Sequence, residues 1–208
     1  MMDDLLRLIS AVDYEDYGSL RLIKVEHRDG NLSLVAEVTA DEATSLPRNI
    51  RIDCHGLRES NVLPNRYYDL RVTEDHVLLW HYSRPHRLLS FYGNVEDPQS
   101  VVGALYERHF EIVGRWVPFH KYLNLRLPLS ELIRGKFGML ADGPDKLVLA
   151  YEAVVQGFGI STSHHESRSA DQMRWNGETW VVQDMPPLSI MFLDDSYVIA
   201  ESFTATPI

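Results

Sequence analysis

The sequence of 208 residues contains a single cysteine, Cys54, and no long apolar run. One cysteine excludes an internal disulfide framework and any zinc site built on several thiolates. Apolar runs such as residues 77–80 and 180–182 fall far short of the roughly 20 residues that a membrane-spanning helix needs. The first residues are acidic, whereas a secretory signal begins with positive charge and continues into an apolar stretch. We therefore expect a cytoplasmic protein that does not enter a membrane.

Positive charge is also scarce. The chain has 20 Lys and Arg residues against 30 Asp and Glu residues, which gives a formal net charge of −10. Nucleic-acid binding draws much of its affinity from Lys and Arg contacts to phosphates, so this balance argues against it. The only slightly basic region, residues 48–87, has no interleaved aromatic stacking motif. We expect no nucleic-acid partner.

Motifs of well-known catalytic sites are missing as well. The sequence has no phosphate-binding glycine loop, no Gly-x-Ser-x-Gly serine, no His-Glu-x-x-His and no calcium loop. The Gly157-Phe158-Gly159 segment lacks the third glycine of a dinucleotide fingerprint and follows a predicted helix, so we interpret it as a helix end. No cofactor is expected.

Helices are predicted where apolar residues recur at helical spacing between start and stop signals. Asp97-Pro98 opens the best-marked helix, which continues to Gly114. Pro144 and Gly157 bracket another helix, although alternating apolar residues over 147–155 leave a strand as the alternative. Two shorter helices are predicted over residues 3–12 and 129–134.

Strands are predicted mainly as hairpins. Asp29-Gly30 favours a tight turn in a hairpin over residues 20–38, with Val25 opposite Leu34 and Ile23 opposite Ala36. Further predicted hairpins pair residues 77–82 with 88–92 as the middle of the sheet, 171–175 with 178–183 around Asn176-Gly177, and 188–193 with 196–203 around Asp194-Asp195. Single strands are predicted over 49–55, 67–73 and 137–141.

These elements predict an α+β fold, in which a mainly antiparallel twisted sheet is built from hairpins and two principal helices pack on one face. We expect residues 1–208 to form a single domain. The alternative is a boundary near Glu96, with a β-rich half over 1–95 and an α+β half over 96–208.

Four histidines are of the residue type that binds metal ions. His76, His81 and His86 recur every five residues, a spacing that brings side chains to one face of neither a helix nor a strand, so we predict no metal site there. His109 lies on the apolar stripe of its helix and is predicted to be a hydrogen-bonded core residue.

The catalytic candidates are His164, His165 and Glu166, within the polar segment 161–170, which is predicted to be a loop. Imidazole and carboxylate groups together can perform acid and base catalysis or bind zinc, given a third ligand. The competing interpretation is a solvated loop.

Two further segments have a structural and a functional interpretation. Cys54 and His55 are neighbours on a predicted strand and therefore point to opposite faces, so Cys54 is expected to be a buried, inert thiol. Trp116, Phe119 and Tyr122 either cover the core or form a protein-binding patch.

Two classes of function remain. The first is a non-catalytic binding or regulatory module that acts through protein–protein contacts, including contacts between two copies of the chain, or that takes a small-molecule ligand. The second is a small hydrolase, or another metal- or ligand-binding enzyme, that gathers histidines and carboxylates from separate strands and from the 161–170 loop. The absence of motifs favours the first class.

Overall fold

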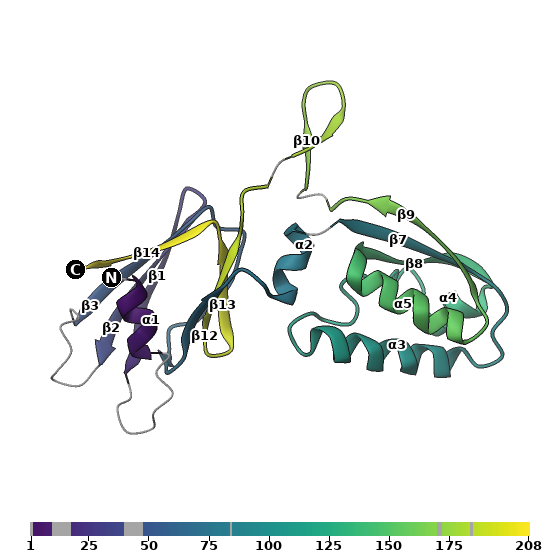
Figure 1. The fold of residues 1–208 in the computed structure, drawn as a ribbon, viewed down its shortest axis with the longest axis horizontal. Coiled ribbons are helices and arrows are strands. Elements are labelled where there is room, and N and C mark those ends of the chain that lie inside the picture. Colours follow the sequence, from purple (N-terminus) through teal and green to yellow (C-terminus); the bar gives the residue numbers. More distant parts are fainter. Residues whose placement is uncertain (1, 10–17, 40–47, 84, 170–171, 184) are drawn as a thin grey trace. The chain divides into compact units, whose positions relative to one another are not determined.

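A computed structural model of the chain describes residues 2–9, 18–39, 48–83, 85–169, 172–183 and 185–208. The fold is of the predicted α+β type, and its strands pair in antiparallel sheets. No described helix is both long enough and apolar enough to cross a membrane. The chain divides into two compact units (Figure 1): unit 1 comprises Met1–Leu79 and Pro186–Ile208, and unit 2 comprises Trp80–Met185. The expectation of a single domain stays a prediction.

Unit 1 contains two antiparallel sheets. One has the strand order β14-β3-β2-β1-β5 and the other the order β4-β13-β12-β6. The first sheet comprises β1 (Ser19–Arg28), β2 (Asn31–Thr39), β3 (Asn49–His55), β5 (Arg66–Tyr67) and β14 (Ser202–Pro207). The second comprises β4 (Glu59–Asn61), β6 (Leu70–Thr73), β12 (Ser189–Leu193) and β13 (Ser196–Ala200).

The two sheets of unit 1 share one hydrophobic core. Leu32 and Leu34 of β2 and Met191 and Val198 of the second sheet belong to the same cluster of buried side chains. Helix α1 (Met2–Ile9) contacts β6 and β14 and adds apolar side chains to this core. The helix predicted over residues 3–12 is thus confirmed as far as residue 9, and its predicted end lies outside the described residues.

The first hairpin forms with one correction to its register. Val25 lies opposite Leu34, as predicted, but Leu22 rather than Ile23 lies opposite Ala36. A β-bulge falls at Ile23, because the register shifts between Leu22 and Lys24. Ile23 therefore lies outside the core with 54% of its surface exposed, while Leu22 is buried.

The predicted strand over residues 67–73 is divided between the two sheets of unit 1. Tyr67 ends β5 in one sheet and Leu70 begins β6 in the other. The carboxylate of Asp194 accepts hydrogen bonds from the backbone N–H groups of Tyr68 and Asp69 and so fixes the chain at this break. The hairpin around Asp194-Asp195 is confirmed as β12 and β13, and the end of its second arm becomes β14 in the other sheet.

Unit 2 contains a three-stranded antiparallel sheet with the order β8-β7-β9 and a two-stranded sheet β10-β11. Helix α5 contacts all three strands of the larger sheet, and α3 packs against α5 and α4. The helices are α2 (Trp80–Ser83), α3 (Pro98–Val113), α4 (Leu129–Arg134) and α5 (Asp145–Gly157). The strands are β7 (His86–Tyr92), β8 (Phe137–Pro144), β9 (Ser161–Ser167), β10 (Met173–Trp175) and β11 (Trp180–Val182).

The helix predictions agree with unit 2. Asp97 caps α3, because its carboxylate accepts hydrogen bonds from the backbone N–H groups of Gln99 and Ser100. Residues 145–157 form a helix and not the alternative strand. The expectation that two principal helices pack on one sheet face stays a prediction, and the described strands form four separate sheets instead of one.

One predicted hairpin is wrong. Residues 77–79 form a 3₁₀ helix, η1 (Val77–Leu79), and α2 follows it directly, so residues 77–82 are helical and not a strand. Four consecutive apolar residues fit either structure, and periodicity alone does not separate them. Strand β7 pairs instead with β8 on one side and β9 on the other, which confirms the central position predicted for residues 88–92.

Gly143 of β8 tests how closely Tyr122 packs against this strand. A Cβ atom added at Gly143 would lie 2.6 Å from Cγ of Tyr122, whereas one added at Gly103 of α3 would meet nothing within 4 Å. We expect Gly143→Ala to lower the free energy of unfolding by about 1–3 kcal/mol through overpacking. Gly103→Ala should raise it by about 0.5–1 kcal/mol, since alanine favours the helix. Urea unfolding of both variants measures the two effects, and equal changes would contradict the packing at Gly143.

Candidate functional site

The predicted catalytic loop is a strand. Residues 161–167 form β9, which pairs with β7 along its length and places His164 opposite Leu89 and Glu166 opposite Arg87. The loop prediction is therefore wrong for these residues. Their polar composition fits an edge strand, since β9 has a neighbour on one side only in the sheet order.

Strand geometry separates the two histidines. Side chains alternate along a strand, so His164 shares a face with Thr162 and His165 lies on the opposite face. The face of His164 is covered by α5, where Glu152 accepts a hydrogen bond from Nδ1 of His164 at 3.2 Å. The candidates His165 and Glu166 make no contact with Glu152 that the structure records.

Glu152 is the centre of a polar cluster that the sequence alone did not reveal. Its Oε1 atom accepts a hydrogen bond from Oγ1 of Thr162 at 2.7 Å, and Nε2 of Gln156 donates to the same threonine oxygen at 2.8 Å. Burial raises the pKa of Glu152, but the hydrogen bonds from Thr162 and His164 and the charges of His164 and Arg87 outweigh it and hold the pKa below its usual value. Glu152 is therefore an ionised carboxylate in a nearly buried position.

This pair has a recognisable chemical use. A carboxylate that accepts from Nδ1–H of a histidine fixes the ring and its tautomer, so that the other ring nitrogen, Nε2, is available as a base. The His164 side chain is 42% exposed, so solvent reaches it. The sequence contains one signal for Glu152 as the partner of His164. Glu152 lies within the apolar stripe of the predicted helix over 145–157, and a carboxylate in such a stripe is seldom left without a partner.

The described residues contain no group of three or more His, Cys, Asp or Glu side chains placed to hold a metal ion. His76 packs edge-on against Phe192 in unit 1. In unit 2 the rings of His81 and His86 lie 5.2 Å apart, and both contact the ring of Tyr122. Each of the three histidines thus has an aromatic contact.

His109 is a core histidine, as predicted. It is fully buried, with Nε2 donating to the carbonyl oxygen of Val117 at 2.7 Å and Nδ1 accepting from the hydroxyl of Tyr151 at 2.6 Å. Burial lowers the pKa of His109, so the ring is neutral at pH 7, and in this neutral ring Nδ1 is the acceptor and Nε2 the donor.

The aromatic candidates and the cysteine lie in different surroundings. Tyr122 is buried, Phe119 packs against His109, and Trp116 is partly buried beneath the guanidinium group of Arg115. Each of the three aromatic residues thus has a ring contact within unit 2. Cys54 is fully buried, and burial raises the pKa of its thiol to about 12, which confirms the expected buried thiol.

An exposed pair of tryptophans lies on the β10–β11 hairpin. Trp175 and Trp180 are 51% and 63% exposed, face each other across the hairpin and have ring centroids 5.8 Å apart. The hairpin around Asn176-Gly177 was predicted, and it forms a two-stranded sheet of its own (Figure 1). The sequence predicts the turn of this hairpin, but it does not indicate that β10 and β11 pair with no other described strand.

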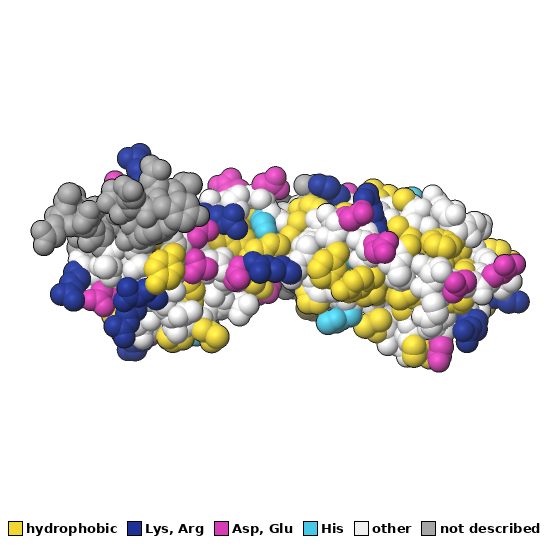
Figure 2. All heavy atoms as spheres, turned by 90° about the horizontal axis from the view of Figure 1, so that it is seen from below, with side chains coloured by type: hydrophobic (Ala, Val, Ile, Leu, Met, Phe, Trp, Pro, Cys, Tyr) yellow, Lys and Arg dark blue, Asp and Glu magenta, His cyan; other side chains and the backbone are white. Residues whose placement is uncertain are grey.

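Charge and apolar surface are distributed unequally between the units. Unit 1 has 18 Asp and Glu residues against 9 Lys and Arg, whereas unit 2 has 12 against 11. Figure 2 shows hydrophobic side chains covering more of the visible face of unit 2, on the right, than of unit 1. On α3 the exposed Tyr106 and Phe110 contribute to the apolar surface of unit 2.

A comparison of the chain with protein-family models, curated proteins and solved structures finds no match.

The neutral state of His109 predicts a pH dependence of stability. Its pKa in the folded protein is below the value of about 6.5 for an unfolded chain, so below that pH the unfolded state binds a proton that the folded state excludes. The free energy of unfolding should fall as the pH drops from 7 to 5, by at most about 1.4 kcal/mol per pH unit for one proton. Urea unfolding of His109→Gln should show a shallower decline than the parent protein. An unchanged slope would contradict the neutral, buried state.

Proposed function

We propose that this protein is a non-catalytic binding module that contacts a partner protein through the β10–β11 hairpin. The observation that carries the proposal is the exposed pair Trp175 and Trp180 on a hairpin that no other described strand covers. Tryptophan is enriched among the residues that supply most of the energy of protein interfaces. Large exposed apolar groups that gather at one place favour an interaction site over an ordinary surface.

The hairpin presents its apolar side chains in a regular way. Met173 lies opposite Val182, and Trp175 lies opposite Trp180 two residues further along, so these four side chains share one face. A two-stranded hairpin alone is at best marginally stable in water. A partner that covers this face would remove the two tryptophan rings from water and would also stabilise the hairpin.

The charge of the chain favours a partner of positive charge over a second copy. Two copies would each have a formal net charge of −10 and would repel one another before contact. A protein of positive net charge would instead be attracted, which raises the rate of association. We therefore commit to a basic partner protein with an apolar groove for the tryptophan pair.

The test compares two matched double variants. Trp175→Thr/Trp180→Thr removes the hairpin pair, and Tyr92→Thr/Phe137→Thr removes another cross-strand aromatic pair, 71% and 72% exposed, from β7 and β8. Proteins captured from cell extract by the parent chain are identified, purified and titrated against all three forms. Loss of one tryptophan contact should cost about 2 kcal/mol or more, so the hairpin variant should bind at least tenfold more weakly.

The outcome must also match the predicted chemistry. The captured protein should have a positive net charge, its association should slow at high salt, and the Tyr92/Phe137 control should bind as the parent chain does. Equal binding by both double variants would contradict the proposal. A parent chain that sediments as a dimer, and a hairpin variant that sediments as a monomer, would identify a second copy as the occupant instead.

The Glu152–His164 pair supports a second candidate function, a small hydrolase. In it the Nε2 atom of His164 would take a proton from the attacking nucleophile, while Glu152 holds the ring and stabilises its charged form. Water is the nucleophile available to this pair, because the Thr162 hydroxyl already donates to Glu152.

The hydrolase hypothesis has its own control on the same strand. With p-nitrophenyl acetate as the probe, His164→Ala should lower the hydrolysis rate by about 100-fold or more, as loss of a general base does. Glu152→Gln should lower it as well, whereas His165→Ala, on the opposite face of β9, should leave it within a factor of two. A similar rate for the His164 and His165 variants would exclude the pair as a catalytic site.

A further inference from the structure

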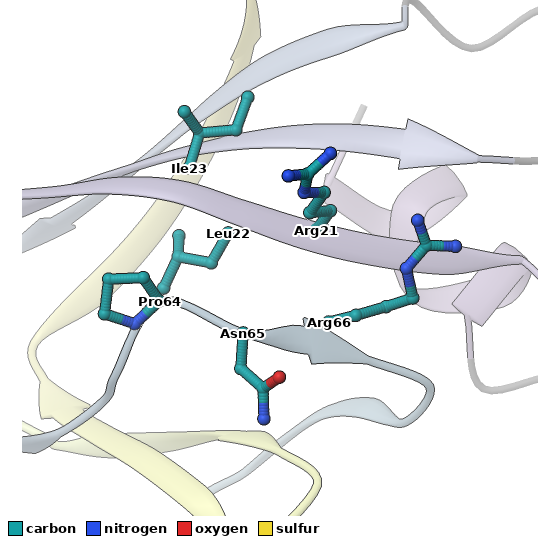
Figure 3. Close-up of a pocket in the computed structure, with 6 residues that line it drawn as sticks. All are labelled: Arg21, Leu22, Ile23, Pro64, Asn65 and Arg66. Atoms are coloured by element: carbon teal, nitrogen blue, oxygen red, sulfur yellow. The ribbon is translucent and has the colours of Figure 1, made fainter.

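We propose that a pocket on unit 1 binds a small organic anion, independently of the hairpin on unit 2. The pocket has a volume of about 430 Å³, which is within the range of about 300–1,000 Å³ typical of small-molecule sites. Two arginines lie at one end of it, while Pro64, Leu22 and Ile23 lie toward the other (Figure 3). The lining residues are Arg21, Leu22, Ile23, Pro64, Asn65 and Arg66.

The pocket exists because β5 pairs with β1 only briefly. The two strands share the pairs Leu20–Tyr67 and Arg21–Arg66, and the backbone N–H of Leu22 then donates to the carbonyl oxygen of Asn65 at 2.8 Å. The β-bulge at Ile23 turns this side chain out of the core, so that its exposed surface contributes to the apolar end. The cationic end is therefore held by regular strand pairing.

The strand register places two like charges side by side. Arg21 and Arg66 are direct partners across β1 and β5, where opposite Cβ atoms lie about 4.5–5.5 Å apart and like charges destabilise the sheet. One carboxylate, that of Glu37, lies near Arg21, at 3.9 Å, but it also pairs with Arg48 at 2.9 Å. Among the described residues, Glu37 thus faces two arginines, and Arg66 adds a third positive charge to this row. An anion between Arg21 and Arg66 would relieve their repulsion.

The chemistry of the two ends defines the ligand class. Guanidinium groups form paired hydrogen bonds with carboxylate or phosphate oxygens, and the Asn65 amide is a further polar group in the lining. The apolar end fits an aliphatic or aromatic body. The arginine pair stands in a unit with twice as many acidic as basic residues, which repels anions in general. Charge alone does not select the ligand, so both ends of the pocket must contact it. The ligand is therefore a small organic oxyanion whose oxygens bind the arginines and whose carbon body contacts the apolar end.

Three probes separate the contributions of the charge and of the apolar body: benzoate, phenyl phosphate and inorganic phosphate. Each is titrated into the full chain while the backbone amide resonances of Arg21, Leu22, Ile23, Asn65 and Arg66 are followed by NMR. We expect saturable shifts at these residues, with at least one aromatic anion binding tenfold or more tightly than inorganic phosphate. Whichever of benzoate and phenyl phosphate binds better identifies the oxyanion as carboxylate or phosphate.

The matched control is a second exposed arginine of the same sheet. Arg66→Gln removes one charge from the pocket, and Arg51→Gln removes one charge from β3, outside the pocket. The first variant should weaken binding at least tenfold, and the second by less than twofold. The unfolding midpoint of each variant verifies that it is folded, and Arg21→Gln provides a second pocket variant. Absence of saturable shifts with all three probes, equal effects of the Arg66 and Arg51 variants, or equal affinity for inorganic phosphate and both aromatic anions would overturn the proposal.

Discussion

The turn of the first hairpin and the core of unit 1 require registers of β1 that differ by one residue, and the β-bulge at Ile23 satisfies both. The turn at Asp29-Gly30, where both residues have positive φ, fixes Val25 opposite Leu34. Burial of Leu20 and Leu22 in the shared core requires the other side-chain parity, because even- and odd-numbered residues of a regular strand face opposite sides. One extra residue in β1 satisfies both demands. The bulge lets β2 bury one whole face and lets both sheets of unit 1 close over a common core.

The same bulge links the core to the surface of unit 1. It turns Ile23 outward beside the place where β5 leaves β1, and so it contributes an apolar side chain to the pocket that contains Arg21 and Arg66. A regular strand in the register of Val25 and Leu34 would have turned Ile23 and Arg21 toward the core and Leu20 and Leu22 away from it. The apolar end of the proposed anion site is therefore a by-product of the register that the core requires.

Elements with strong local signals were predictable from the sequence, and elements defined by distant partners were not. Asp29-Gly30, Asn176-Gly177 and Asp97-Pro98 act through their own backbone geometry, and the structure has turns or a helix start at each. Residues 77–82 and 161–167 lack such signals. The first segment is helical and buries Leu78, Leu79 and Trp80, and the second is a strand because it pairs with β7. The candidate site shows the same division. His164 was identifiable as a functional residue type, but its partner Glu152 lies on α5 and is brought to it only by packing. The break between β5 and β6 likewise depends on Asp194, more than a hundred residues away.

Hydrogen bonding around Glu152 favours a structural role for the cluster and binding as the function of unit 2. Thr162 and His164 together occupy Oε1 of this carboxylate, and Gln156 supports Thr162, so the polar groups between α5 and β9 satisfy one another. Such a network offsets the cost of burying a charge and fixes the helix on the edge strand. Catalysis would instead need groups aimed at a reacting atom. Trp175 and Trp180 present the opposite situation, since their rings remain largely in water. Under the proposed function, a partner would supply the contacts to these rings that the fold itself supplies to Glu152.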